Sequence, residues 1–369
     1  MQAFSLLASI FLLAAVERAA LAFPNPEYTS GNTTVHDPTM CKDNAGKYWL
    51  FSSDVGIEIR TSTDRAMWTY LGTVWPNGAK WTNQYSGKPD GSLWAPACKY
   101  VNEKFILYYA SSTSGSRNSA IFLATSETGQ PGEWNNEGLI ISTSDADDYN
   151  AIDPNLLIDD DGKWWLSFGS YWSGIKVIQL NNSTGHWLDT EMYTVATRTE
   201  DNGAMEGSNI YKYDNYYYLF TSWDRACCNI KSTYNIRVGR SPSVTGPYVD
   251  QAGTPLLSGG GTLVLGPHDN IYGPGGQDQL TDTDGVMLIY HYWNSSKGLF
   301  LGMNHLDFSS GWPVAIYGPV NKNNNTSHTS GCRTCRGRHS WYTASFFSQM
   351  RFIGLGGQQL EHLSTKAFV

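Results

Sequence analysis

The chain carries a recurring pattern of short apolar and aromatic segments. Each segment is rich in Trp, Tyr, Phe, Ile and Leu, and most open on a turn residue, a combination that favours β-strands. The five segments span residues 46–53, 103–112, 162–170, 215–223 and 285–293. A second strand-like run follows each of them. We therefore predict a unit of three or four strands that is repeated five times.

This repeat predicts the fold class. No amphipathic helical stretch of useful length separates the segments, so we expect an all-β chain. One unit cannot bury its apolar faces alone, and radial stacking of five units gives a five-bladed β-propeller over residues 23–320. Two packed β-sandwiches are the alternative. The innermost strand of each blade lines a central cavity, so we expect residues just upstream of each segment to face it.

Three carboxylates occupy equivalent positions relative to these segments. Asp37, Asp153 and Glu206 each lie nine residues before the start of their segment, in the first, third and fourth repeats. Acidic residues are uncommon in strands, and converging like charges repel, so a purely structural role explains this register poorly.

Such a cluster of carboxylates suits glycosidic bond cleavage. One carboxylate activates a water, a second is held protonated and donates to the leaving oxygen, and a third can raise the pKa of that acid. Metal binding is the competing interpretation. The sequence around the three acids contains neither an Asp-rich calcium loop nor a paired-His zinc motif.

Composition narrows the choice of ligand. The 369-residue chain has a formal net charge of −8, and 14% of its residues are aromatic. An acidic, aromatic-rich chain binds nucleic acid poorly and favours a neutral ligand that stacks on rings. Nothing in the pattern indicates an exposed apolar interface, so we expect a monomer without a protein partner.

The first residues indicate export. An apolar run at residues 4–16 is too short to span a bilayer, and Ala20-Leu21-Ala22 follows it as a small-x-small cleavage pattern. We interpret residues 1–22 as a secretory signal peptide, expect no membrane span, and expect a secreted, extracellular protein. Glycosylation sequons compatible with this interpretation occur at Asn32, Asn181, Asn182, Asn294, Asn324 and Asn325.

Secretion permits disulfides among the six cysteines. Cys227 and Cys228 are adjacent, and a bridge between neighbours is strained because their Cα atoms lie closer than the usual disulfide span. Such a vicinal bridge would form a rigid apolar ring. Free or separately paired thiols are the alternative. Cys332 and Cys335 form one CxxC, a weak metal signal on its own.

The motifs upstream of the segments resemble those of glycoside hydrolase family 43. They are HDP at 36–38, WAP at 94–96, AIDPN at 151–155, MEGSN at 205–209 and YNIRVGRS at 234–241. Over residues 35–320 the chain is similar to the fungal endo-1,5-α-L-arabinanases of this family. The resemblance implies a five-bladed propeller that needs no cofactor. It also implies inverting endo-hydrolysis of 1,5-α-L-arabinofuranosidic linkages in arabinan, a side chain of plant cell-wall pectin.

The resemblance also implies residue roles. Asp37 would be the general base, Glu206 the general acid, and Asp153 the residue that tunes and orients the acid. Trp94 and Trp172 are expected to stack on furanose rings. The full set of expected substrate-binding residues is His36, Trp94, Asn150, Asn155, Ser170, Trp172, Cys227, Cys228 and His291.

The chain departs from the family pattern in two places. Many relatives read WAPD and GPGH where this chain has WAPA at 94–97 and GPGG at 273–276. The missing His lies near a central ion in those relatives, so we expect no required metal here. A central ion held in part by His268 or His291 is the alternative. Residues 321–369 carry six Lys or Arg and one Glu. We expect a poorly ordered basic tail there, with a small cationic binding module as the alternative.

Two other functions compete with endo-hydrolysis. An exo-acting α-L-arabinofuranosidase or β-xylosidase of the same family would use the same three acids. A non-catalytic carbohydrate-binding propeller would have lost one of them, whereas all three are present.

Overall fold

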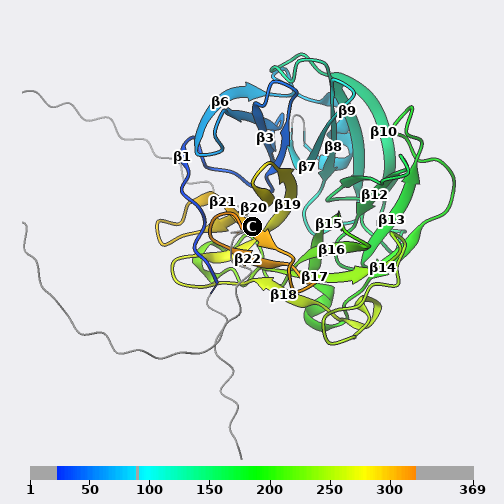
Figure 1. Ribbon diagram of the computed structural model, residues 1–369. Coiled ribbons are helices and arrows are strands. Elements are labelled where there is room, and N and C mark those ends of the chain that lie inside the picture. The colour runs from blue at the N-terminus through cyan, green and yellow to red at the C-terminus, as the bar shows by residue number, and fades with distance from the viewer. Residues whose placement is uncertain (1–22, 89–90, 321–369) are drawn as a thin grey trace, which may run out of the picture. The chain divides into compact units, whose positions relative to one another are not determined.

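A computed structural model describes residues 23–88 and 91–320, which form five antiparallel sheets (Figure 1). The expected signal peptide and the basic segment 321–369 lie outside the described residues. Blade one has the order β1-β6-β5-β3-β2, in which β1 runs parallel to β6. Its strands are β1 (Ser30–Gly31), β2 (Thr39–Lys42), β3 (Tyr48–Ser52), β5 (Glu58–Ser62) and β6 (Met67–Thr73).

The other four blades keep the chain order of their strands. Blade two contains β7 (Ser92–Val101), β8 (Lys104–Ser112), β9 (Ser119–Ser126) and β10 (Asn135–Thr143), and β4 (Asp54–Val55) joins it from a loop of blade one. Blade three contains β11 (Asn155–Ile158), β12 (Trp164–Phe168), β13 (Ile175–Leu180) and β14 (Tyr193–Ala196). Blade four contains β15 (Met205–Tyr213), β16 (Tyr216–Trp223), β17 (Asn235–Ser241) and β18 (Thr262–Leu265). Blade five contains β19 (Tyr272–Asp282), β20 (Gly285–Trp293), β21 (Leu299–Asp307) and β22 (Val314–Ile316).

Helical structure in the described residues is confined to single turns between strands. These are η1 (Lys80–Thr82), α1 (Asn83–Ser86), η2 (Glu200–Gly203), η3 (Asn229–Lys231) and η4 (Leu256–Ser258). Among residues 23–88 and 91–320, no helix has the length and apolar character needed to cross a bilayer.

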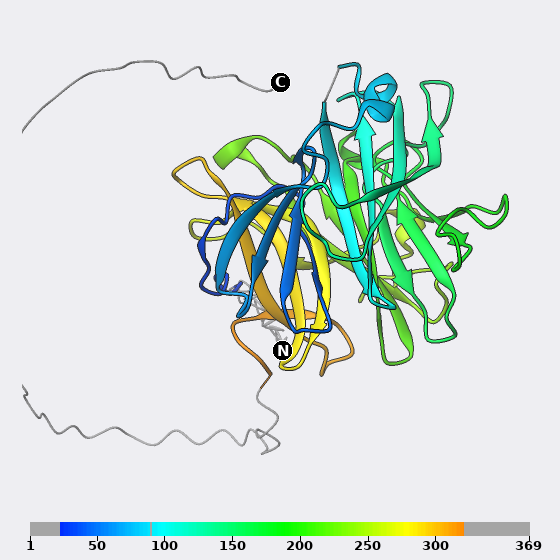
Figure 2. The same cartoon turned by 90° about the horizontal axis from the view of Figure 1, so that it is seen from above.

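The innermost strands close a ring. Contacts run from β2 to β7, β11, β15 and β19 in turn, and β19 contacts β2 again. Figure 2 shows the blue strands of blade one beside the yellow and orange strands of blade five. The predicted five-bladed β-propeller is therefore confirmed, and two packed sandwiches are excluded.

The repeated segments are aromatic because each sheet is buried on both faces. Neighbouring residues of a strand point to opposite faces. Trp49 and Phe51 of β3 therefore pack into a cluster with Leu107 of blade two, while Leu50 between them packs with Met287 of blade five. Comparable clusters of buried side chains lie between blades two and three, three and four, and four and five. Full burial of one such side chain contributes about 1.5–3 kcal/mol.

The ring closes without strand exchange between its first and last blades. Lys42 and Arg65 of blade one form ion pairs with Asp282 at the end of β19. The segment before β1 also runs along blade five, where the backbone N–H of Glu27 donates to the carbonyl of Met303. Closure therefore rests on side-chain packing, ion pairs and this N-terminal segment.

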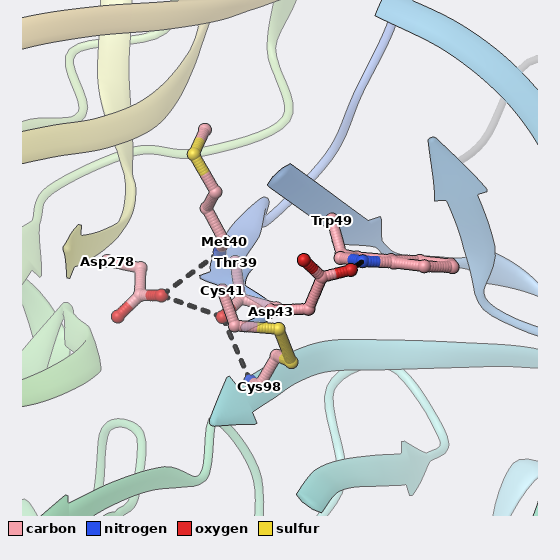
Figure 3. Close-up of a disulfide and its surroundings, with 7 residues drawn as sticks. All are labelled: Thr39, Met40, Cys41, Asp43, Trp49, Cys98 and Asp278. Atoms are coloured by element: carbon pink, nitrogen blue, oxygen red, sulfur yellow. Dashed lines mark hydrogen bonds between the residues drawn. A yellow bond between two sulfur atoms is a disulfide. The ribbon is translucent and has the colours of Figure 1, made fainter. Parts of the chain in front are cut away.

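A disulfide joins blades one and two. Cys41 of β2 bonds to Cys98 of β7, 57 residues further along the chain (Figure 3). The bond therefore connects two of the innermost strands.

Candidate active site

The backbone makes the same left-handed turn in the innermost segment of three blades. Asp37, Ala95 and Asp153 have φ angles of 45°, 43° and 56°, and a proline follows each. A non-glycine residue in this conformation costs about 1–3 kcal/mol, and such strain clusters at functional sites. In blade four the turn falls on Gly207, with φ 60°. Glu206 therefore comes from the residue before the turn, a one-residue difference that the equal sequence spacing conceals.

The three acids nevertheless converge. The backbone N–H of Gly207 donates to Oδ2 of Asp153 at 2.9 Å, which places Asp153 beside the segment that carries Glu206. Burial raises the pKa of Asp153 well above its usual value, and the charges of Glu206 and then Asp37 raise it further. All three carboxyl groups are only partly exposed. The arrangement therefore disfavours full ionisation of the cluster.

Glu206 has the environment of a proton donor. Burial raises its pKa, and the charge of Asp37 adds to this, although hydrogen bonds from Tyr234 and Ser170 act in the opposite direction. The hydroxyl of Tyr234 donates to Oε1 at 3.0 Å, and Oγ of Ser170 donates to Oε2 at 3.0 Å. Burial also raises the pKa of Tyr234, which keeps its hydroxyl protonated and able to donate.

Asp37 is held from two sides. Oγ of Ser53 donates to its Oδ2 at 3.0 Å, and Ser53 in turn accepts the backbone N–H of Ala95. The backbone N–H of Asp37 donates to Nδ1 of His291 at 3.1 Å. A side chain at Gly276 would collide with both groups, because its Cβ would lie 2.3 Å from Oδ1 of Asp37 and 2.8 Å from the His291 ring. Glycine at position 276 thus lets His291 and Asp37 approach one another.

The two histidines of the site differ in charge. Burial and the neighbouring charge of His36 lower the pKa of His291 to about 3, so it is neutral. Burial would lower the pKa of His36 as well, but Asp37, Cys227 and Asp153 outweigh it and raise the value to about 10. Nε2 of His36 lies 3.7 Å from Oδ2 of Asp37 and 3.7 Å from Sγ of Cys227. A cation therefore sits beside the carboxylates.

Of the two alternatives left open for Cys227 and Cys228, the vicinal disulfide is absent and both cysteines are free thiols. Cys227 is exposed and directs its sulfur toward His36, whereas the backbone N–H of Cys228 donates to Oγ of Ser232. The two residues are thus held by different partners. An apolar disulfide ring under the sugar is not available in this arrangement.

The remaining expected binding residues lie in three places. Ser170 contacts Glu206 directly. Trp172 is 40% exposed, and the guanidinium of Arg117 lies over its ring, 5.3 Å from the ring centroid. Trp94 is half-buried against the core between blades two and three.

The two expected asparagines lie deeper than the acids. Asn150 is buried, and its Oδ1 accepts a hydrogen bond from Ser119 of the neighbouring blade at 2.6 Å. Nδ2 of Asn155 faces Oδ1 of the buried Asp278 at 3.4 Å. The structure does not bring either amide into hydrogen-bonding contact with the three acids.

A cation fits the histidine side of the site poorly. Within the described part of the chain, His36, Asp37 and His291 bring ligand atoms to within 4.8 Å of one another. However, Nδ1 of His291 already accepts the N–H of Asp37, and the raised pKa keeps His36 protonated. Neither histidine therefore offers a free lone pair to a metal ion, so we assign no catalytic step to a metal.

Sequence reasoning missed Ser53, Tyr234 and Asp278. A signal for the first was present, because Ser53 and Ser170 both close a repeated aromatic segment and both contact a catalytic-site carboxylate. Tyr234 opens the YNIRVGRS motif. Asp278 follows the GPGG motif but falls outside the register of the other acids, so the spacing did not reveal it.

The chain matches the model of "Glycosyl hydrolases family 43" over residues 30–313. An extracellular endo-alpha-(1->5)-L-arabinanase of Bacillus subtilis is 38% identical over 82% of this chain and 93% of its own length. An arabinan endo-1,5-alpha-L-arabinosidase of Aspergillus niger is 40% identical over 83% of this chain and 98% of its own.

Solved structures of arabinanases have a similar backbone fold. An endo-arabinanase from Bacillus licheniformis superposes with a TM-score of 0.73 at 38% identity, covering 78% of this chain and 99% of that chain. An exo-1,5-alpha-L-arabinanase from a bovine ruminal metagenomic library gives 0.73 at 32% identity, covering 79% and 99%. Backbone similarity alone therefore does not separate internal from terminal cleavage.

Proposed function

Because the chain belongs to glycosyl hydrolases family 43, we propose that it is an endo-hydrolase that cuts 1,5-α-L-arabinofuranosidic linkages of arabinan with inversion. The observation that carries the proposal is the convergence of Asp37, Asp153 and Glu206 in a partly buried cluster where the pKa values of Asp153 and Glu206 are raised. The relatives at 38–40% identity are named for endo-cleavage of this polymer.

The carboxylates divide the chemistry. Asp37 removes a proton from a water, which attacks the anomeric carbon from the face opposite the scissile bond. As that bond breaks, Glu206 gives its proton to the leaving O5 of the next arabinose, and the bond electrons stay on that oxygen. This inverting route needs a base and an acid on opposite faces of the sugar.

The surrounding groups prepare both carboxyls for these tasks. Asp153 lies beside Glu206 and accepts the backbone N–H of Gly207, which holds the segment that carries the proposed acid. Nε2 of His36 lies 3.7 Å from Oδ2 of Asp37, so a positive charge stands beside the proposed base. Ser170 and Tyr234 fix both oxygens of Glu206, so the acid cannot rotate freely away from the leaving oxygen.

The substrate and its location follow from the same family. We propose a neutral polysaccharide substrate, with the exposed face of Trp172 as a stacking surface for a sugar ring. Secretion is proposed from the N-terminal sequence, and the Bacillus subtilis relative is named extracellular. We propose that the protein acts as a monomer.

Product analysis on linear arabinan tests the function. Internal cleavage predicts that a ladder of arabino-oligosaccharides precedes free arabinose and that viscosity falls early. Glu206→Gln protein prepared in parallel excludes a contaminating hydrolase. Early release of arabinose alone would identify an exo-enzyme, and faster turnover of xylan would contradict the substrate.

A further inference from the structure

One buried carboxylate other than Asp37, Asp153 and Glu206 lies among the innermost strands of the ring. Asp278 of β19 is 2% exposed and receives hydrogen bonds from three other blades. Its Oδ2 accepts from Oγ1 of Thr39 at 2.7 Å and from the backbone N–H of Met40 at 3.2 Å (Figure 3). Its Oδ1 accepts from Nδ2 of Asn209 at 2.7 Å and faces Nδ2 of Asn155 at 3.4 Å.

The partners of Asp278 stand immediately after the three catalytic acids. Thr39 follows Asp37 by two residues and Asn155 follows Asp153 by two; Asn209 follows Glu206 by three. The extra residue in blade four is absorbed by a register shift between Glu206 and Asn209. Each acid therefore lies only two or three residues along the chain from one Asp278 partner.

Blade two joins the same hydrogen-bond network indirectly, through Thr39. Oγ1 of Thr39 accepts the backbone N–H of Cys98 while it donates to Asp278. The disulfide between Cys41 and Cys98 lies beside this bond (Figure 3). Hydrogen bonds centred on Asp278 thus reach all five innermost strands.

We propose that Asp278 is a positioning residue for the hydrolysis, which fixes the relative placement of Asp37, Asp153 and Glu206 by anchoring their strands to one point. This inference rests on the proposed function. A carboxylate suits the position because it accepts on two oxygens and donates nothing, so donors from three strands can converge on it. The amide of an asparagine at position 278 would accept on one oxygen only. Its N–H groups would point at atoms that donate to Asp278 in the wild type.

Asp278→Asn provides the test, and Asp282→Asn is its matched control. Both residues lie on β19 with buried carboxylates. Asp282 pairs with Arg65 and with Lys42 at the far end of β2. The hydrogen bonds from Thr39, Asn155 and Asn209 go to Asp278 and not to Asp282. A displacement of about 1 Å in a catalytic group can lower the rate about 100-fold. We expect Asp278→Asn to lower kcat on linear arabinan at least ~10-fold with KM little changed, and to shift the alkaline limb of the pH profile.

Asp282→Asn should lose thermal stability but keep its kcat and pH profile at 25 °C. Thr39→Val provides a second variant that removes one donor and keeps the carboxylate, and we expect it to lower kcat less than Asp278→Asn. Folded Asp278→Asn or Thr39→Val protein with wild-type kcat and pH profile would overturn the inference while leaving the hydrolase assignment intact. Lack of arabinan hydrolysis by the wild type would instead overturn the proposed function.

Discussion

At the scale of single residues, the site depends on opposing influences on one carboxyl group. Burial raises the pKa of Glu206, while hydrogen bonds from Tyr234 and Ser170 lower it. The balance leaves a pKa above the usual glutamate value, as a general acid requires. The two hydrogen bonds orient the carboxyl group at the cost of part of that rise.

Removing one of these donors should move the pH profile of kcat/KM. Ser170→Ala deletes a hydrogen bond that favours the ionised carboxylate, so the pKa of Glu206 rises further. Activity requires protonated Glu206, so the alkaline limb of the kcat/KM profile should move to higher pH. Loss of one hydrogen bond to a charged carboxylate should move it by about one pH unit. Tyr234→Phe should act in the same direction.

The acid limb of that profile provides the internal control. In the proposed mechanism this limb belongs to the base, Asp37, and neither Ser170 nor Tyr234 hydrogen-bonds to it. An alkaline limb that moves to lower pH, or a shift confined to the acid limb, would contradict the assignment of Glu206 as the acid.

At the scale of elements, the sequence predicted most of what recurs. All five repeated segments became strands that lie second from the ring centre, namely β3, β8, β12, β16 and β20. The three acids were predictable because their spacing repeats with these strands. Their roles remain predictions from the family resemblance.

What occurs only once was not predictable. Cysteine spacing does not determine pairing, so the Cys41–Cys98 bond could not be derived, and the vicinal bridge considered at Cys227 was wrong. The first and third repeats have Thr39 and Asn155 at the position of Asp278, so no repeated carboxylate marked it. Its partners come from separate blades, and only closure of the ring brings them together.

The disulfide between β2 and β7 should stabilise the fold. Closing a loop of 57 residues contributes about 4 kcal/mol in the chain-entropy account. Replacing both Cys41 and Cys98 by Ala should therefore lower the free energy of unfolding by about 3–4 kcal/mol, measured by urea denaturation.

A free thiol provides the comparison for that experiment. Cys227→Ser changes an exposed cysteine that forms no disulfide and should leave the unfolding midpoint in place. Equal midpoints for the wild type and the Cys41/Cys98 double variant would contradict a stabilising role of the bond.

At the scale of the whole molecule, the ring brings like-charged carboxyl groups together at its centre. Between blades one and five it instead pairs Asp282 with cations. The pKa of Asp153 is raised, so its ionisation opposes folding, and this contribution is lost as pH falls toward the unfolded-state pKa. Asp282 is the reverse case. Burial would raise its pKa, but hydrogen bonds from Lys42 and Tyr48 lower it, so its ionisation favours folding until the pH falls through the folded-state pKa.

The two carboxylates should therefore respond oppositely to neutralisation. At pH 7 we expect Asp153→Asn to raise the melting temperature and Asp282→Asn to lower it, with about 2–4 °C for each kcal/mol. Calorimetry at several pH values checks the sign. The difference for Asp153→Asn should shrink as the pH falls toward about 4, whereas the difference for Asp282→Asn should persist to about pH 4 and shrink only below it. A lower melting temperature for Asp153→Asn at neutral pH would show that the cluster does not oppose folding.

The most direct test of the account asks whether Glu206 protonates the leaving oxygen. The measurement compares wild type, Glu206→Gln and Asp37→Asn on linear arabinan and on an arabinotrioside with a 2,4-dinitrophenolate leaving group, which departs without a proton. We predict that Glu206→Gln loses at least ~10²-fold in kcat on arabinan but retains most activity on the dinitrophenyl substrate, whereas Asp37→Asn loses activity on both. Equal losses of Glu206→Gln on the two substrates, or near-normal turnover of arabinan, would contradict the account.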